Sequence, residues 1–388
     1  MMKINFFKYN SFLVAIYCFN NTFLRIFQIF NLNVNYSKYL LLFFFSFIIF
    51  EIKNLNFKFL KYILIISLII LLNILFSKVG IEEKVIAMNN IYITGMSATI
   101  VGSLKIKRRF IEKYLKYMSY LNIVVYSYIF FFNKILYYRQ INYMVFGYAL
   151  LQSSIFLLYI IYKNKKIVSK DLIFILYSLG MIILFGSRLT AIILIFSILV
   201  FYWYYEKNKI KKLMAYYLVL IINLLVYINL KELLIYISNY FSYLNRDITG
   251  IRRLIESLEL EKIGGDITSG RNDIYVEAIN IIKKNPLGIG VLGYLSEVES
   301  NFLELGYYPH NIFIEIGMHW GILGLLIFMT VILRIGYKIV KLKNDDYKFF
   351  LITLILLNIK LLLSDTYISY NIFWLFWAVY FNKSYRYN

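Results

Sequence analysis

Apolar runs of about 20 residues recur along the whole chain, and the short segments between them are polar and rich in lysine. A helix of that length spans the hydrocarbon core of a bilayer. Alternation of apolar and polar positions over about ten residues, which is typical of a membrane barrel, does not occur in the sequence. The pattern therefore predicts an all-α polytopic membrane protein.

The runs predict about twelve transmembrane helices. Asn20, Asn21 and Arg25 interrupt the first of them, and the fourth is rich in glycine, serine and threonine. In chain order the predicted spans are residues 11–30, 37–52, 59–77, 88–104, 116–133, 143–162, 171–186, 189–205, 213–230, 311–333, 347–364 and 367–382.

The composition agrees with this class, since 61% of the residues are hydrophobic and 16% are charged. The formal net charge of +21 would also suit a nucleic-acid-binding protein, but the distribution of the charge argues against that function. If the N-terminus is cytoplasmic, the inside segments hold 26 Lys and Arg residues and the short outside loops hold six. This asymmetry follows the positive-inside rule and predicts that both termini are cytoplasmic.

One long hydrophilic segment, residues 231–310, follows the ninth predicted span and is expected outside. Long connections without structure are uncommon, and two stretches of this one have helical spacing. We interpret residues 1–388 as a single membrane domain that carries a large external helical loop, or cap, at 231–310 between spans nine and ten.

Cys18 is the only cysteine and the chain has two histidines, so an intrachain disulfide is impossible and a zinc or haem site is disfavoured. The cap has no Asp-x-Asp pair, which argues against a metal-dependent transferase that uses nucleotide sugars. Neither a metal nor a cofactor is expected. The sequence GIGVLG at 288–293 follows an Asn-Pro pair instead of a strand, so it predicts a turn and not a dinucleotide site.

Arg271 is the first candidate for anion binding. Thr268, Ser269 and Gly270 precede it and are typical of a helix N-cap. Free N–H groups and the positive end of the helix dipole would then lie beside a guanidinium group whose fork fits two phosphate oxygens. The alternative is a surface arginine that pairs with Asp273 or with a nearby glutamate.

Other cations occupy positions where they could also hold an anion. Arg188 lies in a tight turn between spans seven and eight, where it either binds an anion at the outer membrane surface or snorkels to the interface. Arg252 and Arg253 on a predicted cap helix either add positive field over an anionic substrate or are only solvated. Arg25 and Lys360 lie within apolar runs, and the pattern leaves their roles open.

His310 and His319 are nine residues apart, which is half a turn out of phase on a helix, so they cannot share a site. On a continuous helix, His310 would share a face with Gly317, Gly321 and Gly324, and such a face allows another helix to approach closely. This predicts His310 at the outer mouth of the bundle as a proton acceptor or donor. His319 is expected to be a packing residue.

In this order, the candidate residues resemble the bacterial O-antigen polymerase and O-antigen ligase superfamily over residues 186–324. The ligase pattern is His, then Asn, Ser or Gln, nine residues, Gly, two residues, and Gly, Thr or Val. It is matched in full by His310, Asn311, Gly321 and Gly324. The ligase-type Arg-x-x-x-Leu is only approximate, because Arg188 is followed by Ile192.

The resemblance implies a metal-independent glycosyltransferase on the outer face of the bacterial inner membrane. A polymerase moves a growing glycan from undecaprenyl diphosphate to the next lipid-linked repeat unit, whereas a ligase moves it to lipid A core. Arg188 and Arg271 would hold the diphosphate, and His310 would take the proton of the acceptor hydroxyl. Substrate-binding roles are expected for Arg252, Arg253, Asn272, Tyr275 and Asn311.

We take the polymerase as the first hypothesis, because the first 180 residues resemble the superfamily only in span number and hydropathy, and polymerases are the more divergent class. The full match to the ligase pattern keeps the ligase as the alternative. A flippase or transporter of lipid-linked sugars is disfavoured, since the chain has no internal repeat. The expected partners are the lipid-linked donor and acceptor, membrane lipids, a chain-length regulator and a flippase, with no nucleic acid.

Overall fold

The computed structural model describes residues 6–32, 57–133, 143–165, 168–185, 187–214, 216–217, 234–240, 271–297 and 309–382, together with isolated positions between 232 and 259. The regular secondary structure of these residues is helical, and no strand occurs among them. The predicted all-α class is confirmed.

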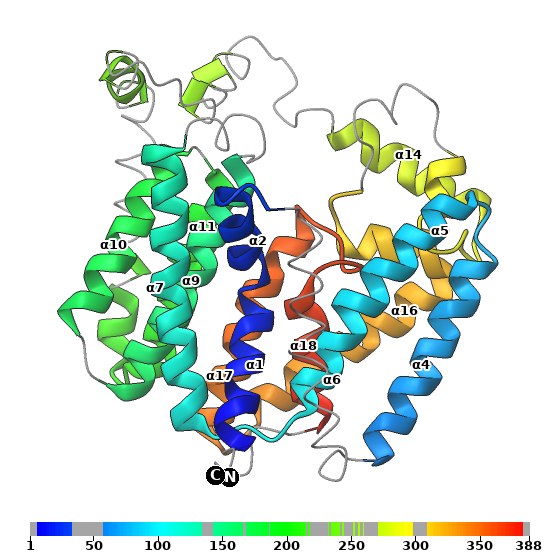
Figure 1. Ribbon diagram of the computed structural model, residues 1–388, viewed down its shortest axis with the longest axis horizontal. Coiled ribbons are helices and arrows are strands. Elements are labelled where there is room, and N and C mark those ends of the chain that lie inside the picture. The colour runs from blue at the N-terminus through cyan, green and yellow to red at the C-terminus, as the bar shows by residue number, and fades with distance from the viewer. Residues whose placement is uncertain are drawn as a thin grey trace. The chain divides into compact units, whose positions relative to one another are not determined.

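The chain forms two compact units, coloured by residue number in Figure 1. The first comprises residues 1–20, 35–114 and 270–388, and the second comprises residues 21–34 and 115–269. The boundary after Tyr114 falls inside α7 (Arg108–Phe132). The other helices of the first unit are α1 (Phe6–Cys18), α4 (Phe57–Leu75), α5 (Ile81–Met88), the π-helix η2 (Asn89–Met96), α6 (Ser97–Ser103), α14 (Arg271–Lys284), the 3₁₀ helix η3 (Gly293–Ser296), α16 (Ile312–Val340), α17 (Asp345–Asn358), the 3₁₀ helix η4 (Ile359–Leu362) and α18 (Asn371–Asn382).

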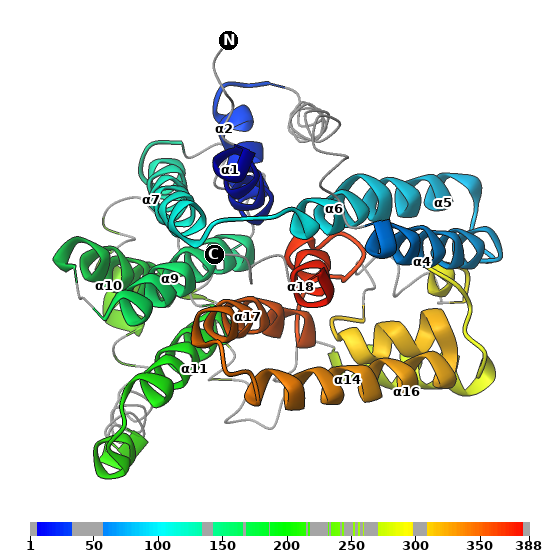
Figure 2. The same cartoon turned by 90° about the horizontal axis from the view of Figure 1, so that it is seen from below.

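In the first unit, α18 packs beside α6, as both Figure 1 and Figure 2 show. The two helices approach closely because Gly102 of α6 lies opposite Ala378 of α18, and a Cβ atom on Gly102 would come within 2.8 Å of the Ala378 side chain. Small residues at such positions bring helices together where lipid supplies no hydrophobic driving force.

In the second unit, α9 (Tyr143–Asn164) packs against α10 (Ser169–Leu184) and α11 (Arg188–Tyr205). Most of α2 (Asn20–Ile29) and the rest of α7 also belong to this unit. Most side chains of α9 from Phe146 to Ile161 are buried. The ring centroid of Phe146 lies 3.9 Å from the ring centroid of Phe185, which follows the last residue of α10. A helix that is apolar all round is expected to be enclosed by others, as α9 is.

Four described helical segments are long and apolar enough to cross a membrane: residues 81–103, 143–164, 188–205 and 312–340. They correspond to the predicted spans 88–104, 143–162, 189–205 and 311–333. α1 and α2 would add a fifth if they are counted as one span. The predicted span 37–52 and most of 213–230 lie outside the described residues. The count of twelve spans and the placement of the cap stay predictions.

The predicted span 11–30 is not one continuous helix. α1 ends at Cys18 and α2 begins at Asn20, so Phe19 separates the two helices. Arg25 is buried within α2, and its Nη1 atom donates to Gln28 Oε1 at 2.6 Å. A buried arginine in an apolar run therefore acquires a polar partner from its own helix.

α16 differs most from its prediction, because it is interrupted. Gly321 has φ of 71° and ψ of −174°, which breaks the helical ladder. The carbonyl groups of Met318 and His319 therefore need partners from outside the helix. The turn after α14 supplies them, since Ile289 N–H donates to Met318 O at 2.9 Å and Gly290 N–H donates to His319 O at 3.2 Å.

The same turn receives hydrogen bonds in return. Ile322 N–H, just past the break, donates to Pro286 O at 2.9 Å. Asn73 of α4 connects α16 with the turn after α14. Its Nδ2 donates to His319 O at 3.1 Å, and its Oδ1 accepts from Val291 N–H at 2.8 Å. The turn predicted at 288–293 is confirmed. Together with Pro286, it is hydrogen-bonded to α16 on both sides of the break at Gly321.

His319 is fully buried beside this turn, which agrees with its predicted packing role. The N–H of Leu292 donates to Nε2 at 3.3 Å, so Nε2 is the unprotonated nitrogen. Nδ1 then carries the proton and donates to Tyr367 Oη, 3.0 Å away. Trp320 Nε1 also donates to this hydroxyl group at 3.1 Å, so His319 links the break to the segment before α18.

Replacing Gly288 by alanine is expected to lower the free energy of unfolding by about 2–5 kcal/mol, from the left-handed backbone and from overpacking. Gly288 has φ of 90°, and an added Cβ atom would lie 2.6 Å from Gly321 N. Gly336→Ala is the matched control, because Gly336 in the same α16 has open space around it and a helical alanine is favoured by about 1 kcal/mol. Thermal unfolding of the detergent-solubilised protein measures both, and equal midpoints would contradict the expectation.

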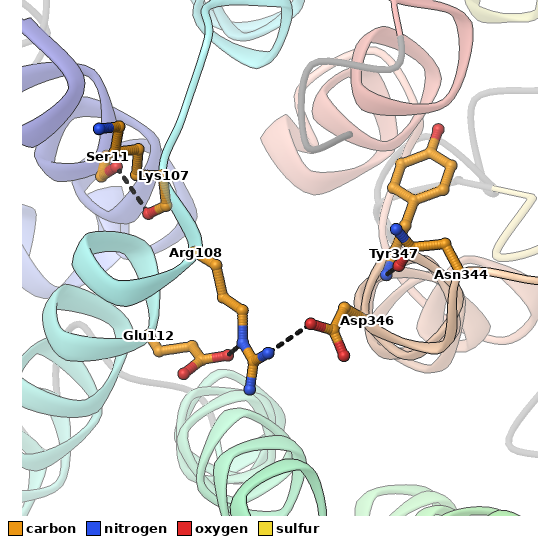
Figure 3. A network of polar contacts seen from close by, with 7 residues as sticks. All are labelled: Ser11, Lys107, Arg108, Glu112, Asn344, Asp346 and Tyr347. Atoms are coloured by element: carbon orange, nitrogen blue, oxygen red, sulfur yellow. Dashed lines mark hydrogen bonds and ion pairs between the residues drawn. The ribbon is translucent and has the colours of Figure 1, made fainter. Parts of the chain in front are cut away.

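A second polar network ties the starts of α7 and α17 together within the first unit (Figure 3). Arg108 Nε donates to Glu112 Oε1 at 2.8 Å, and its Nη1 pairs with Asp346 Oδ2. Asn344 Oδ1 caps α17 by accepting from Tyr347 N–H at 2.9 Å. The predicted topology places this network at the cytoplasmic end, away from the candidate residues of the cap.

Candidate functional site

Arg271 is the first residue of α14 and is half-buried. The helix is held in place by its apolar face, where Ala278 and Ile281 pack in a cluster with Met318 of α16. Asp273 in the first turn and two lysines in the last turn suit the helix dipole. Residues 268–270, the predicted N-cap, lie outside the described residues. The placement brings Arg271 to the positive end of a helix that is anchored on α16.

Asn311 fixes the start of α16 as its N-cap residue. Its Oδ1 accepts from the N–H groups of Phe313 at 2.9 Å and Ile314 at 3.3 Å. The structure thus gives Asn311 a capping role, and the substrate-binding role predicted for it stays a prediction.

His310 precedes this helix and does not belong to its first turn. Its φ is 48°, a left-handed conformation that few non-glycine residues adopt. The expected face shared with the glycines is therefore wrong, because His310 lies outside the helix and the break at Gly321 rotates Gly324 away from a common phase. Gly317 instead faces Ile282 of α14, which would lie 2.9 Å from an added Cβ atom.

The electrostatic surroundings of His310 connect it to Arg271. Burial and the positive charge of Arg271 lower the pKa of His310 to about 4, and Asp365 acts in the opposite direction. The imidazole ring is therefore neutral at physiological pH and can accept a proton. Of the three predicted catalytic residues, the structure brings Arg271 and His310 into one electrostatic cluster.

η4 and the loop between it and α18 add two charged residues to this cluster that the sequence left unassigned. Lys360 Nζ pairs with Asp365 Oδ2 at 2.5 Å and lies 3.9 Å from the ring centroid of Tyr370. Asp365 has φ of 70°, and its Oδ1 accepts from Thr366 N–H at 2.9 Å. Two opposite charges five residues apart within an apolar run are the signal that could have paired them.

Glu315 is the other acidic residue of the cluster, and it is buried in the first turn of α16. The hydroxyl group of Thr366 donates to Glu315 Oε1. Asp365 adds a like charge next to this carboxyl group. The cluster thus contains Arg271, His310, Glu315, Lys360 and Asp365.

The predicted binding residues of α14 lie on two different sides of the helix. Tyr275 is one turn after Arg271 and shares its face. Its hydroxyl oxygen is buried and has no hydrogen-bond partner among the described residues. Asn272 is exposed, and its binding role stays a prediction.

The remaining predicted site residues belong to the second unit. Arg188 is the first residue of α11, after the buried Ser187, and its side chain is exposed. Arg252 is exposed and lies 3.6 Å from Glu256 one turn away. Arg253 lies outside the described residues. The joint action of these arginines with Arg271 and His310 stays a prediction.

Within the described ranges, no three His, Cys, Asp or Glu side chains gather closely enough to hold a metal ion. Residues 173–329 match the family model described as O-antigen ligase. The match includes Arg188, Arg271 and His310, and it supports the resemblance to the O-antigen polymerase and ligase superfamily. No curated protein and no solved structure matches the chain.

Proposed function

We propose that this chain of the O-antigen polymerase and ligase superfamily transfers a growing glycan from undecaprenyl diphosphate to the next lipid-linked repeat unit, as a surface-polysaccharide polymerase. The reaction would take place on the outer face of the inner membrane. The observation that carries the proposal is the cluster of Arg271, at the N-terminal end of α14, with the neutral imidazole of His310. The family match spans both residues.

The chemistry needs a cation on one side of the reacting carbon and a base on the other. The acceptor hydroxyl oxygen bonds to the anomeric carbon while the bond from that carbon to the diphosphate breaks and its electron pair leaves with the diphosphate. Arg271 and the first N–H groups of α14 would stabilise this growing negative charge. His310 would receive the proton of the acceptor hydroxyl.

Binding of the donor would also change the pKa of His310. In the cluster without substrate, the field of Arg271 and burial keep the pKa of His310 at about 4. The negative charge of a bound diphosphate opposes the field of Arg271, so it raises the proton affinity of the imidazole ring. His310 would therefore become a stronger base when the donor is in place.

The pH dependence of transfer follows from this pKa. Because kcat/KM reports the free enzyme, we expect it to stay level from pH 7 to about pH 5 and to fall as the pH drops through about 4, where His310 becomes protonated. An imidazole with its ordinary pKa would lose activity near pH 6.5. Initial transfer rates at limiting acceptor concentration measure the profile, and a midpoint at 6.5 would contradict the assigned environment of His310.

The ligase remains the second candidate, because the segment from His310 to Gly324 satisfies the whole ligase pattern. The two functions differ in their loss phenotypes. Loss of a polymerase would leave one repeat unit on lipid A core, whereas loss of a ligase would leave none and lipid-linked polymer would accumulate.

Reconstitution tests the proposed function directly. Purified protein in liposomes is supplied with undecaprenyl-diphosphate-linked repeat units, with or without lipid A core. A polymerase lengthens the glycan on the carrier lipid without lipid A core, and a ligase yields product only when lipid A core is present. Absence of product under both conditions, from protein with a normal unfolding midpoint, would overturn the proposal.

A further inference from the structure

Glu315 has a feature that packing alone does not explain. Its side chain is 1% exposed, yet one carboxyl oxygen, Oε2, has no hydrogen-bond partner among the described residues. Buried polar atoms are nearly always satisfied, and leaving one unpaired costs about 1–3 kcal/mol. A carboxyl group in this state is open to a ligand that donates a hydrogen bond.

The other oxygen is held in place, so Oε2 has a fixed direction. Thr366 donates its hydroxyl proton to Glu315 Oε1, and its oxygen accepts from Ile368 N–H at 3.1 Å. A backbone hydrogen bond from Tyr367 also acts on this carboxyl group. Glu315 is therefore oriented by the loop before α18, as a group that binds a ligand must be.

The surrounding charges decide which kind of ligand fits. Asp365 lies beside Glu315 and also acts on His310, so all three belong to one cluster. Asp365 is paired with Lys360, so the acceptor left open in this part of the cluster is Glu315 Oε2. A diphosphate oxygen has no hydrogen to donate to it and is attracted by Arg271 instead. A neutral hydroxyl group can donate to a carboxyl oxygen, so the acidic part of the cluster fits a sugar.

We propose that Glu315 Oε2 accepts a hydrogen bond from a hydroxyl group of the acceptor sugar and so orients that sugar beside His310. The proposal rests on the proposed glycan transfer. It divides the cluster into a cationic part at Arg271 for the diphosphate and a hydrogen-bond acceptor at Glu315 for the sugar. Glu315 would determine acceptor affinity without contacting the diphosphate.

The test separates affinity for the sugar from affinity for the diphosphate. Glu315→Leu and Glu315→Gln are assayed in liposomes, with the lipid-linked repeat unit as the varied acceptor and undecaprenyl diphosphate, which carries no sugar, as the competing inhibitor. Leaving a buried polar group without its hydrogen bond corresponds to about 10- to 100-fold in affinity. We expect Glu315→Leu to raise the acceptor KM by that factor and to leave the inhibition constant of undecaprenyl diphosphate unchanged.

Glu315→Gln preserves the size and part of the hydrogen-bonding capacity of the side chain, so its acceptor KM is expected to rise less than that of Glu315→Leu. Glu297→Gln is the control, because Glu297 is another carboxylate of the same unit and pairs with the exposed Lys78 at 3.3 Å, outside the cluster. An unchanged acceptor KM in both Glu315 variants would overturn the inference. So would an equal rise in KM and in the inhibition constant, which indicates a structural role. Failure of the wild-type protein to form product contradicts the proposed function instead.

Discussion

Replacement of His310 is expected to lower the rate of glycan transfer by about 10²–10⁴-fold, the usual contribution of a general base. His310 is neutral and lies within the electrostatic field of Arg271, so it can take the acceptor proton while Arg271 holds the diphosphate. The best variant is His310→Asn, because asparagine adopts the left-handed backbone that φ of 48° requires and cannot act as a base. Chain length on the carrier lipid, followed with time in liposomes, measures the rate.

The unfolding midpoint of His310→Asn serves as its control. If His310→Asn unfolds at the same temperature as the wild type but lengthens glycans much more slowly, the result supports a chemical role for His310. If His310→Asn made polymer at the wild-type rate, His310 would not be the base, and the proposed reaction would need another proton acceptor.

Replacement of Arg271 by alanine is expected to slow transfer by about 10²–10³-fold, by analogy with the loss of one donor to a developing negative charge. The guanidinium group stands at the N-terminal end of α14, where backbone N–H groups point in the same direction. Arg271→Lys retains the charge but not the planar fork, so its rate should lie between those of the wild type and Arg271→Ala. Inhibition by undecaprenyl diphosphate should weaken in parallel with the rate.

Lys283→Ala provides the matched control for charge. Lys283 is an exposed cation in the last turn of the same helix, so its removal changes the net charge equally without touching the cluster. Equal effects of Lys283→Ala and Arg271→Ala would mean that general electrostatic attraction, and not a defined contact, explains the loss.

The class of the fold could be predicted from the length of the apolar runs alone. The predicted spans 143–162 and 189–205 agree with α9 and α11 to within two residues at each end. The interruption at Gly321 could not be predicted, because a glycine in an apolar run also occurs in continuous membrane helices. It depends on the turn after Pro286, which supplies the hydrogen bonds that the break removes.

The parts of the candidate site that depend on residues close together in the sequence could be predicted. The position of Arg271 at the start of a helix could be predicted because residues typical of a helix N-cap precede it. His310 became a candidate because the chain has only two histidines, and its catalytic role stays a prediction. The predicted helix face shared by His310 and the glycines was wrong, because it required a helix that begins before Ile312 and continues past Gly321. Glu315 was missed because a single acidic residue in an apolar helix gives no sign of its partner.

Asp365 and Lys360 were missed as a pair for a related reason. From hydropathy, the segment around them is predicted to be the end of the span 347–364 and the start of the span 367–382. The opposite charges hinted at the pair, but the turn that brings them to 2.5 Å includes φ of 70° at Asp365, and hydropathy does not predict that conformation.

The contact between Gly288 and Gly321 also restricts how this chain can evolve. Each glycine occupies the space that a side chain on the other would need, and each has a positive φ. A mutation at either position is therefore harmful by itself, and a second mutation at the partner position cannot relieve it, because both backbones remain strained. Descendants of this protein should retain the two glycines together or rebuild the turn and the break in a single insertion or deletion.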